Sequence, residues 1–171
     1  MPVNLEIKVA LTSHKKVKAV LKEIGAEFKG ILTQKDIYYK SPGCLLKMRI
    51  QNDRTELIRY NRVESGDTRW SDYDVILLSG KKVPDFFNNI LKTETVVQKK
   101  RELWLYDNTR IHLDTVKGLG YFLELETLVL KGRKDAEKRF NEMVKVLSLD
   151  FDRQIRSSYR NLMKARDKKA K

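Results

Sequence analysis

The sequence has little of what secreted or membrane-spanning chains depend on. Cys44 is its one cysteine, so no internal disulfide can form. No stretch approaches the ~18 consecutive apolar residues of a transmembrane helix, and the first residues lack the apolar run of a signal peptide. These absences favour a cytoplasmic protein in a reducing environment, with no membrane partner.

Linkers and repeats are also missing from the sequence. No long stretch of glycine, proline and serine divides the chain, and no segment recurs at a fixed period. A length of 171 residues is typical of one domain, and a hydrophobic content of 41% supplies enough apolar residues for a core. We therefore expect a single domain over residues 1–171, with a C-terminal helix and basic tail over about residues 152–171.

Acidic residues are outnumbered, with 23 against 36 lysines and arginines, and the formal net charge is +13. Such a charge makes nucleic acid a candidate partner. Part of the excess lies in the C-terminal tail, however, and the other basic residues are interspersed with acids. An interior lined with cations that bind phosphate would produce the same sum, so we expect no specific nucleic-acid partner.

What the sequence does contain is a series of segments in which polar and apolar residues alternate. Alternate side chains of a strand share a face. An antiparallel sheet with one wet face would explain any single segment of this kind, whereas a closed barrel with a charged interior would gather all of them around one lumen. The shared faces are Asn4, Glu6 and Lys8; Lys47, Arg49 and Gln51; Lys99 and Arg101; Arg110, His112 and Asp114; and Glu124 and Glu126, with Arg59 in a further segment.

The same patterns predict the elements of an α+β fold. Strands are expected over residues 5–11, 28–39, 45–51, 55–63, 70–78, 95–106, 109–116 and 120–130. Helices are expected after a Thr12-Ser13 cap, after Pro84, over residues 134–147 and from about residue 152. The apolar strand faces then need a cover on the outside. We predict an antiparallel closed barrel, or tunnel, of about eight strands with a polar interior, packed outside by helices.

Acids grouped among many cations suit one class of ligand, a metal ion that carries a polyphosphate. Carboxylate oxygens bind a hard divalent cation, and lysine and arginine bind the phosphate oxygens. His112 shares a strand face with Arg110 and Asp114. We interpret it as a hydrogen-bonded interior side chain rather than a base or a ligand, because no second well-placed histidine accompanies it. Arg156 and Tyr159 could lie across a tunnel mouth, although a packed terminal helix is the plainer interpretation.

The segment Asn-Leu-Glu-Ile-Lys at residues 4–8 resembles the Glu-x-Glu-x-Lys signature of the CYTH family, the triphosphate tunnel metalloenzymes. Residues 32–39, 46–49, 56–60, 100–103, 110–114 and 118–126 follow in the order of that family, and resemble its class IV adenylate cyclase-like and thiamine triphosphatase-like branch. The resemblance implies a tunnel that binds a triphosphate together with Mg²⁺ or Mn²⁺.

Residue roles also follow from the resemblance. It implies metal ligation by Glu6, Asp114, Glu124 and Glu126. Asn4 stands where the signature has its first Glu, and its amide oxygen can still ligate a cation but adds no negative charge. The resemblance implies that phosphate is bound by Lys8, Lys47, Arg49, Arg59, Lys99, Arg101 and Arg110, and that Lys8, Arg59 and Asp114 take part in catalysis.

Three functions remain open at this level. The first is metal-dependent hydrolysis of a triphosphate, such as inorganic tripolyphosphate, thiamine triphosphate or a nucleoside triphosphate. The second is a class IV adenylate cyclase, which converts ATP to cyclic AMP and pyrophosphate. The third is a non-catalytic module that binds polyphosphate or triphosphate. The expected partner is the small-molecule substrate, and the expected assembly is a monomer or a homodimer.

Overall fold

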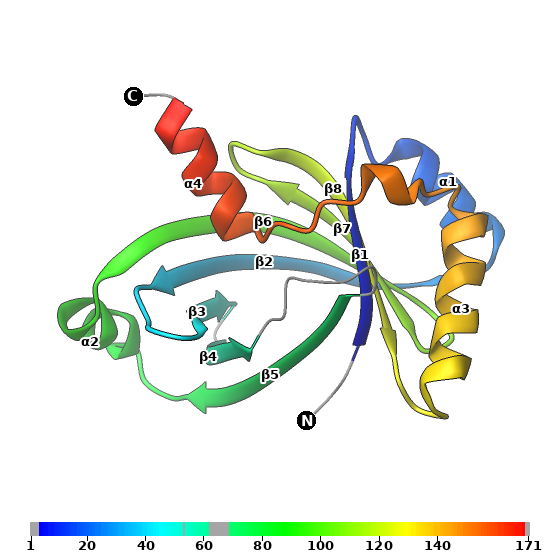
Figure 1. Cartoon of the computed structure of the whole chain (residues 1–171). Helices are drawn as coiled ribbons and strands as arrows, with labels where there is room; N and C mark the ends of the chain where they lie inside the picture. Colours follow the sequence, from blue (N-terminus) through cyan, green and yellow to red (C-terminus); the bar gives the residue numbers. More distant parts are fainter. Residues whose placement is uncertain (1–3, 53, 62–68, 170–171) are drawn as a thin grey trace.

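The computed structural model describes residues 4–52, 54–61 and 69–169, and at residue 61 and residues 69–72 it describes the backbone alone. Within these ranges the chain forms eight strands and four α-helices (Figure 1). The strands are β1 (Asn4–Leu11), β2 (Glu27–Tyr39), β3 (Leu45–Gln51), β4 (Arg54–Asn61), β5 (Arg69–Leu78), β6 (Thr93–Tyr106), β7 (Thr109–Val116) and β8 (Gly120–Leu128). The helices are α1 (Lys15–Glu23), α2 (Val83–Ile90), α3 (Arg133–Val146) and α4 (Tyr159–Lys169), with a short 3-10 helix at Phe151–Arg153.

The strands are all antiparallel to their neighbours. Their order is β1-β5-β4-β3-β2-β6-β7-β8, and β8 pairs back with β1, so the order is that of a closed barrel. The pairing of β1 with β8 runs over all of Asn4–Leu11, whereas its pairing with β5 covers residues 4–6 alone. The α+β class and the eight antiparallel strands are thus confirmed. The predicted end of one strand at residue 63 lies outside the described residues.

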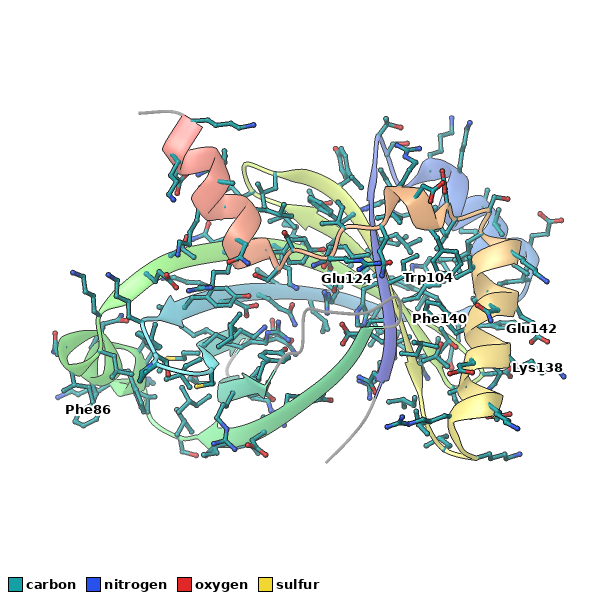
Figure 2. The ribbon with its side chains drawn as sticks, viewed as in Figure 1. Phe86, Trp104, Glu124, Lys138, Phe140 and Glu142 are labelled. Atoms are coloured by element: carbon teal, nitrogen blue, oxygen red, sulfur yellow. The ribbon has the colours of Figure 1, made fainter. Side chains whose placement is uncertain are left out.

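The main apolar core lies between the outer face of the barrel and two helices. Leu5, Ile7 and other alternate residues of β1, β7 and β8 pack against α1 and α3, and these two helices lie on the same side of the strands (Figure 1). On α3, Phe140 points toward the strands, whereas Lys138 and Glu142 point away (Figure 2). Each fully buried leucine or isoleucine contributes about 1.5–3 kcal/mol to the free energy of folding. Because this core lies on the outer face of the strands, the inner face carries polar side chains.

A second apolar cluster covers the outer face of β2 and β3. Ile37, Tyr39 and Met48 are buried there against Val83 and Phe87 of α2. Pro84 occupies the first turn of α2, as predicted, because its missing N–H and fixed φ suit that position. No helix in the described part of the chain is long and apolar enough to cross a membrane.

Two local predictions are wrong. The last helix begins at Tyr159, not near residue 152. Residues 154–155 instead follow β1, because Ile155 N–H donates to Lys8 O at 2.7 Å and Gln154 forms a bridge with Val9. The tertiary hydrogen bond therefore overrides the helical spacing of Ile155 and Tyr159. Helix α1 has His14 at its N-cap with no capping hydrogen bond from a side chain, so Thr12-Ser13 does not cap it.

Candidate functional site

A pocket lies inside the barrel, on the inward faces of six strands and against the start of α4. Its empty volume, including the space open to solvent at the opening, is about 580 Å³. Five basic side chains line it, namely Lys8, Lys47, Arg49, Lys99 and Arg101. Four acids line it with them, namely Glu6, Asp36, Glu124 and Glu126. The remaining lining residues are Tyr38, Leu45, Tyr60, Ser158 and Tyr159.

Asp36 of β2 organises one side of the pocket. Arg49 donates to both of its oxygens, from Nε at 2.8 Å and from Nη2 at 2.8 Å, and Lys47 Nζ donates to Oδ2 at 3.1 Å. Burial by itself would raise the pKa of Asp36, but the charges of Lys47 and Arg49 hold that pKa well below its usual range. Burial, and then the neighbouring Arg49, lower the pKa of Lys47 to about 8.

Asp114 of β7 organises a second group of charges. It is fully buried, and it accepts from Arg101 Nε at 2.7 Å, from Arg101 Nη2 at 2.6 Å and from the hydroxyl of Tyr159 at 2.8 Å. Lys99 Nζ lies 3.5 Å from Asp114 Oδ2. Burial would raise the pKa of Asp114, but the charges of Arg101 and Lys99 hold it below its usual value. Burial, and then Arg101, lower the pKa of Lys99 to about 8.

Glu124 joins these groups to the N-terminal strand. Arg101 Nη2 donates to Glu124 Oε2 at 2.6 Å, and Lys8 Nζ lies 3.1 Å from Glu124 Oε1. Lys8 Nζ also donates to Ser157 O at 3.0 Å and lies 4.3 Å from the centre of the Tyr159 ring. The start of α4 is thus held against the pocket by the same lysine that pairs with Glu124.

The acids and bases of the pocket are nearly equal in number. With Asp114 directly behind the lining residues, five acids face the five bases. This agrees with the high cost of burying an unpaired charge. We expected that cations inside the barrel could produce the net charge of the chain. That expectation is wrong, because the acids of the pocket offset its cations. Most of that positive excess belongs to residues outside the pocket.

Three possible metal ligands meet beside the pocket. The ligand atoms of His112, Glu124 and Glu126 all lie within 4.8 Å of one another. His112 Nδ1 is 3.5 Å from Glu126 Oε1 and forms no hydrogen bond with the described residues. Burial, and then the charge of Arg101, lower the pKa of His112 to about 4, so the ring is neutral at pH 7. Two carboxylates and a neutral imidazole fit a divalent cation such as Mn²⁺.

The predicted site residues divide into three groups. Glu6, Lys8, Lys47, Arg49, Lys99, Arg101, Glu124 and Glu126 line the pocket together. Asp114 lies behind the pocket, where it contacts Arg101, Lys99 and Tyr159. It is not part of the possible ligand group that contains Glu124 and Glu126. Arg110 lies beside it, with Nη1 3.8 Å from Glu126 Oε2. Asn4 is buried, and its Oδ1 finds no hydrogen-bond partner among the described residues.

Arg59 does not reach the pocket. Its side chain is 53% exposed and pairs with Asp74, with Nε 2.9 Å from Oδ2. Tyr60, the next residue of β4, lines the pocket instead. Because alternate residues of a strand face opposite sides, Arg59 lies on the outer surface. The expected position of Arg59 inside the barrel, on which its predicted catalytic and phosphate-binding roles depended, is therefore wrong.

The sequence analysis missed Asp36, Tyr38, Tyr60 and Ser158. Asp36 and Tyr38 continue the alternation of β2 after Gln34, so the pattern contained a signal for both. His112 was expected to be hydrogen-bonded, but its Nδ1 has no such partner in the described part of the chain. Tyr159 does lie against the pocket, where its hydroxyl donates to Asp114.

Comparison with known proteins adds three findings. The family model described as CYTH domain matches residues 3–155. A Methanocaldococcus jannaschii protein, "Putative adenylate cyclase MJ0240", is 26% identical over 172 residues. The match covers 94% of this chain and 98% of that protein. The PH1012 protein of Pyrococcus horikoshii has a similar structure, with a TM-score of 0.82 at 20% identity over 93% of this chain and 98% of that one.

A plant structure is also similar. It is the Hippeastrum protein HpAC1, a "Putative adenylyl cyclase" described as having a dominant triphosphatase activity. It gives a TM-score of 0.68 at 10% identity and covers 96% of both chains. At these identities the two solved structures show a shared fold alone.

Proposed function

Because the chain belongs to the CYTH domain family, we propose that it uses the barrel as a closed tunnel for the metal-dependent hydrolysis of a triphosphate. One observation carries this proposal, the convergence of four buried cations and the partly exposed Arg49 on a pocket that also holds carboxylates beside His112. A triphosphate is a dense chain of anionic oxygens, and lysine and arginine are its natural ligands. Arg49 and Arg101 add the paired donors that lysine does not have.

The equal numbers of acids and bases suggest how binding would proceed. Each cation in the pocket that turns toward a phosphate oxygen leaves a carboxylate without its partner. An unpaired buried carboxylate is costly, and a divalent cation would remove that cost at Glu124 and Glu126. The arrangement therefore supports the binding of triphosphate and metal as one unit, rather than of either alone.

In this proposal the metal is held by Glu6, Glu124 and Glu126, and when bound it supplies charge stabilisation to the phosphoryl group and lowers the pKa of water. Phosphoryl transfer otherwise depends on positioning and charge neutralisation.

The cations of the pocket position the substrate. Lys47 and Arg49 hold one end of it, and Lys8, Lys99 and Arg101 hold the other. Asp114 keeps Arg101 in place through two hydrogen bonds. Hydrolysis needs water in line with the terminal phosphorus.

Adenylate cyclase activity is the second candidate, and the name of the Methanocaldococcus jannaschii relative favours it. Cyclisation would use the same tunnel, but the ribose 3′ oxygen would have to lie in line with the α-phosphorus. The activity described for the Hippeastrum protein favours hydrolysis. We rank hydrolysis first because it requires a triphosphate site alone, without a further site for the base.

Product analysis separates these functions. The protein is given tripolyphosphate, thiamine triphosphate and ATP in parallel, with Mg²⁺ and then with Mn²⁺. Free phosphate from any of them supports the triphosphatase and ranks its substrates. Cyclic AMP and pyrophosphate from ATP, without free phosphate, would replace it with the cyclase. Tight binding of tripolyphosphate with no product would leave a non-catalytic phosphate-binding module.

Arg49→Ala is expected to weaken tripolyphosphate binding by about 10- to 150-fold, the equivalent of ~1.5–3 kcal/mol for hydrogen bonds to charged groups. Binding is measured by titration calorimetry in the absence of turnover. Arg59→Ala is the matched control, since Arg59 also pairs with an aspartate but lies on the outer face of the next strand. Equal losses in the two variants would mean that the pocket is not the phosphate site.

Proton uptake is expected to accompany binding near pH 8.5. In the free protein the pKa of Lys47 is about 8, and a bound phosphate raises it because the anion favours the charged amine. The affinity that depends on this charge is complete below the free pKa and is lost as the pH rises from the free pKa through the higher pKa of the complex. Calorimetry in two buffers of different ionisation enthalpy counts the protons taken up. Lys47→Arg, which stays charged, should take up fewer protons than the wild type, and equal uptake would contradict this role of Lys47.

A further inference from the structure

His112 is a buried side chain, and one of its ring nitrogens has no hydrogen-bond partner among the described residues. It is 5% exposed, and Nδ1 is among the few buried side-chain atoms of the described residues without a hydrogen bond. Leaving such a buried atom unpaired costs about 1–3 kcal/mol. The nearest acid, Glu126, has Oε1 at 3.5 Å, beyond a well-formed hydrogen bond. The described part of the chain therefore supplies no hydrogen-bond partner for this nitrogen.

The register of the sheet places this nitrogen next to two carboxylates. His112 of β7 is directly opposite Glu124 of β8, and Glu126 follows on the same face of β8. Directly opposite and diagonal residues of neighbouring strands are within side-chain reach. Lys8 and Arg101 already hold one oxygen each of Glu124, whereas Glu126 has two looser contacts, Arg110 at 3.8 Å and His112 itself. Glu126 is thus the acid best able to take a cation jointly with His112.

We propose that His112 binds the divalent cation through Nδ1, together with Glu124 and Glu126, and that this nitrogen ligand makes the centre select Mn²⁺ and similar transition-metal ions over Mg²⁺. The inference rests on the proposed metal-dependent function and names a ligand for it. Imidazole is a common ligand of transition metals. Mg²⁺ prefers oxygen ligands throughout its shell, and it gains little from a nitrogen.

The electron spin echo of bound Mn²⁺ tests this ligand directly. Nitrogen that is bonded to Mn²⁺ modulates the echo, and ¹⁵N-histidine labelling changes the pattern without any mutation. The full chain is loaded with Mn²⁺, with and without tripolyphosphate. We expect a nitrogen modulation that changes on labelling. A modulation that is absent, or that labelling does not alter, would overturn the proposal.

The chain offers a matched control, because it has just two histidines. His14 lies at the start of α1, where its Nε2 is 3.2 Å from Phe122 O. His14→Gln should keep the modulation, and His112→Asn should remove it. By calorimetry, His112→Asn should weaken Mn²⁺ binding by at least about tenfold, in line with the loss of a group that supports a metal site. Mg²⁺ binding should change far less, and equal losses for the two metals would contradict the selectivity.

The outcomes also separate this inference from the proposed function. Metal-dependent hydrolysis with no histidine nitrogen on Mn²⁺ would leave the triphosphatase standing and remove His112 from the centre. Failure of Mn²⁺ to bind would overturn this inference alone, whereas failure of both Mg²⁺ and Mn²⁺ to bind, even with tripolyphosphate present, would overturn both. Thermal unfolding of each variant shows whether a loss of binding comes from a loss of fold, and the labelling experiment on the wild type is independent of that question.

Discussion

Replacing Glu126 with glutamine should lower metal-dependent turnover by at least about 100-fold, which corresponds to ~3 kcal/mol of transition-state stabilisation from the metal. The amide keeps the shape of the side chain but removes the charge that a divalent cation requires. The fold should tolerate the change, because the partners of Glu126 are distant: Arg110 lies at 3.8 Å and His112 at 3.5 Å. Phosphate release from the preferred triphosphate, measured across a range of Mn²⁺ concentrations, tests the expectation.

Glu102 supplies the matched control for this experiment. Its side chain is 19% exposed, as is that of Glu126, and it pairs with Lys18 of α1 on the outer side of the barrel wall. Glu102→Gln therefore removes an equally buried carboxylate that faces away from the pocket, and turnover should stay within about twofold because an ion pair with the 37% exposed Lys18 contributes little. Wild-type turnover in Glu126→Gln would remove that residue from the metal centre.

The polar inner face and the apolar outer face of the barrel could be predicted from the sequence. Alternation such as Glu6-Ile7-Lys8 places apolar residues on one face of a strand and charges on the other, and the structure buries Ile7 under the helices while Glu6 and Lys8 line the pocket. The turn geometry also followed from local chemistry. Gly25, with φ at +73°, follows the end of the first helix, because glycine adopts that conformation without strain.

Which strands are neighbours could not be predicted in the same way. β1 lies between β5 and β8, and β2 pairs with β6 across a large separation in sequence. These pairings depend on the packing of the whole sheet, and they determine which charges meet. The contact of Asp114 with Tyr159 spans 45 residues, and no local pattern contains it. The role of Asp114 as an anchor for Arg101 therefore became visible only in the structure.

Errors at single residues have a related cause. Arg59 was placed inside because it belongs to a segment that resembles the family, yet a shift of one residue along a strand reverses the face. His112 was expected to be hydrogen-bonded, on the basis of the number of histidines in the chain, whereas its Nδ1 has no such partner among the described residues. Its neighbours depend on the register between β7 and β8, where His112 lies opposite Glu124.

Asp114→Ala should lower the free energy of unfolding by about 3–5 kcal/mol, the cost of leaving a buried ionic partner uncompensated. The variant would take from Arg101 one of its two carboxylate partners, and it would remove the carboxylate at which the amine of Lys99 and the hydroxyl of Tyr159 are directed. Urea unfolding in the presence of a chelator measures the loss without any contribution from metal. Such a loss would identify Asp114 as the residue that holds the cations of the pocket in place.

Asp74→Ala is the comparison that makes the result specific. Asp74 also pairs with an arginine of a neighbouring strand, but both side chains are largely open to solvent, so its removal should cost less than about 1 kcal/mol. If Asp114→Ala instead unfolds like the wild type and loses Mn²⁺ binding, the carboxylate is a metal ligand, as the family resemblance implied. The free energy of unfolding measured without metal separates the two results, because its loss shows that the carboxylate stabilises the metal-free fold through Arg101.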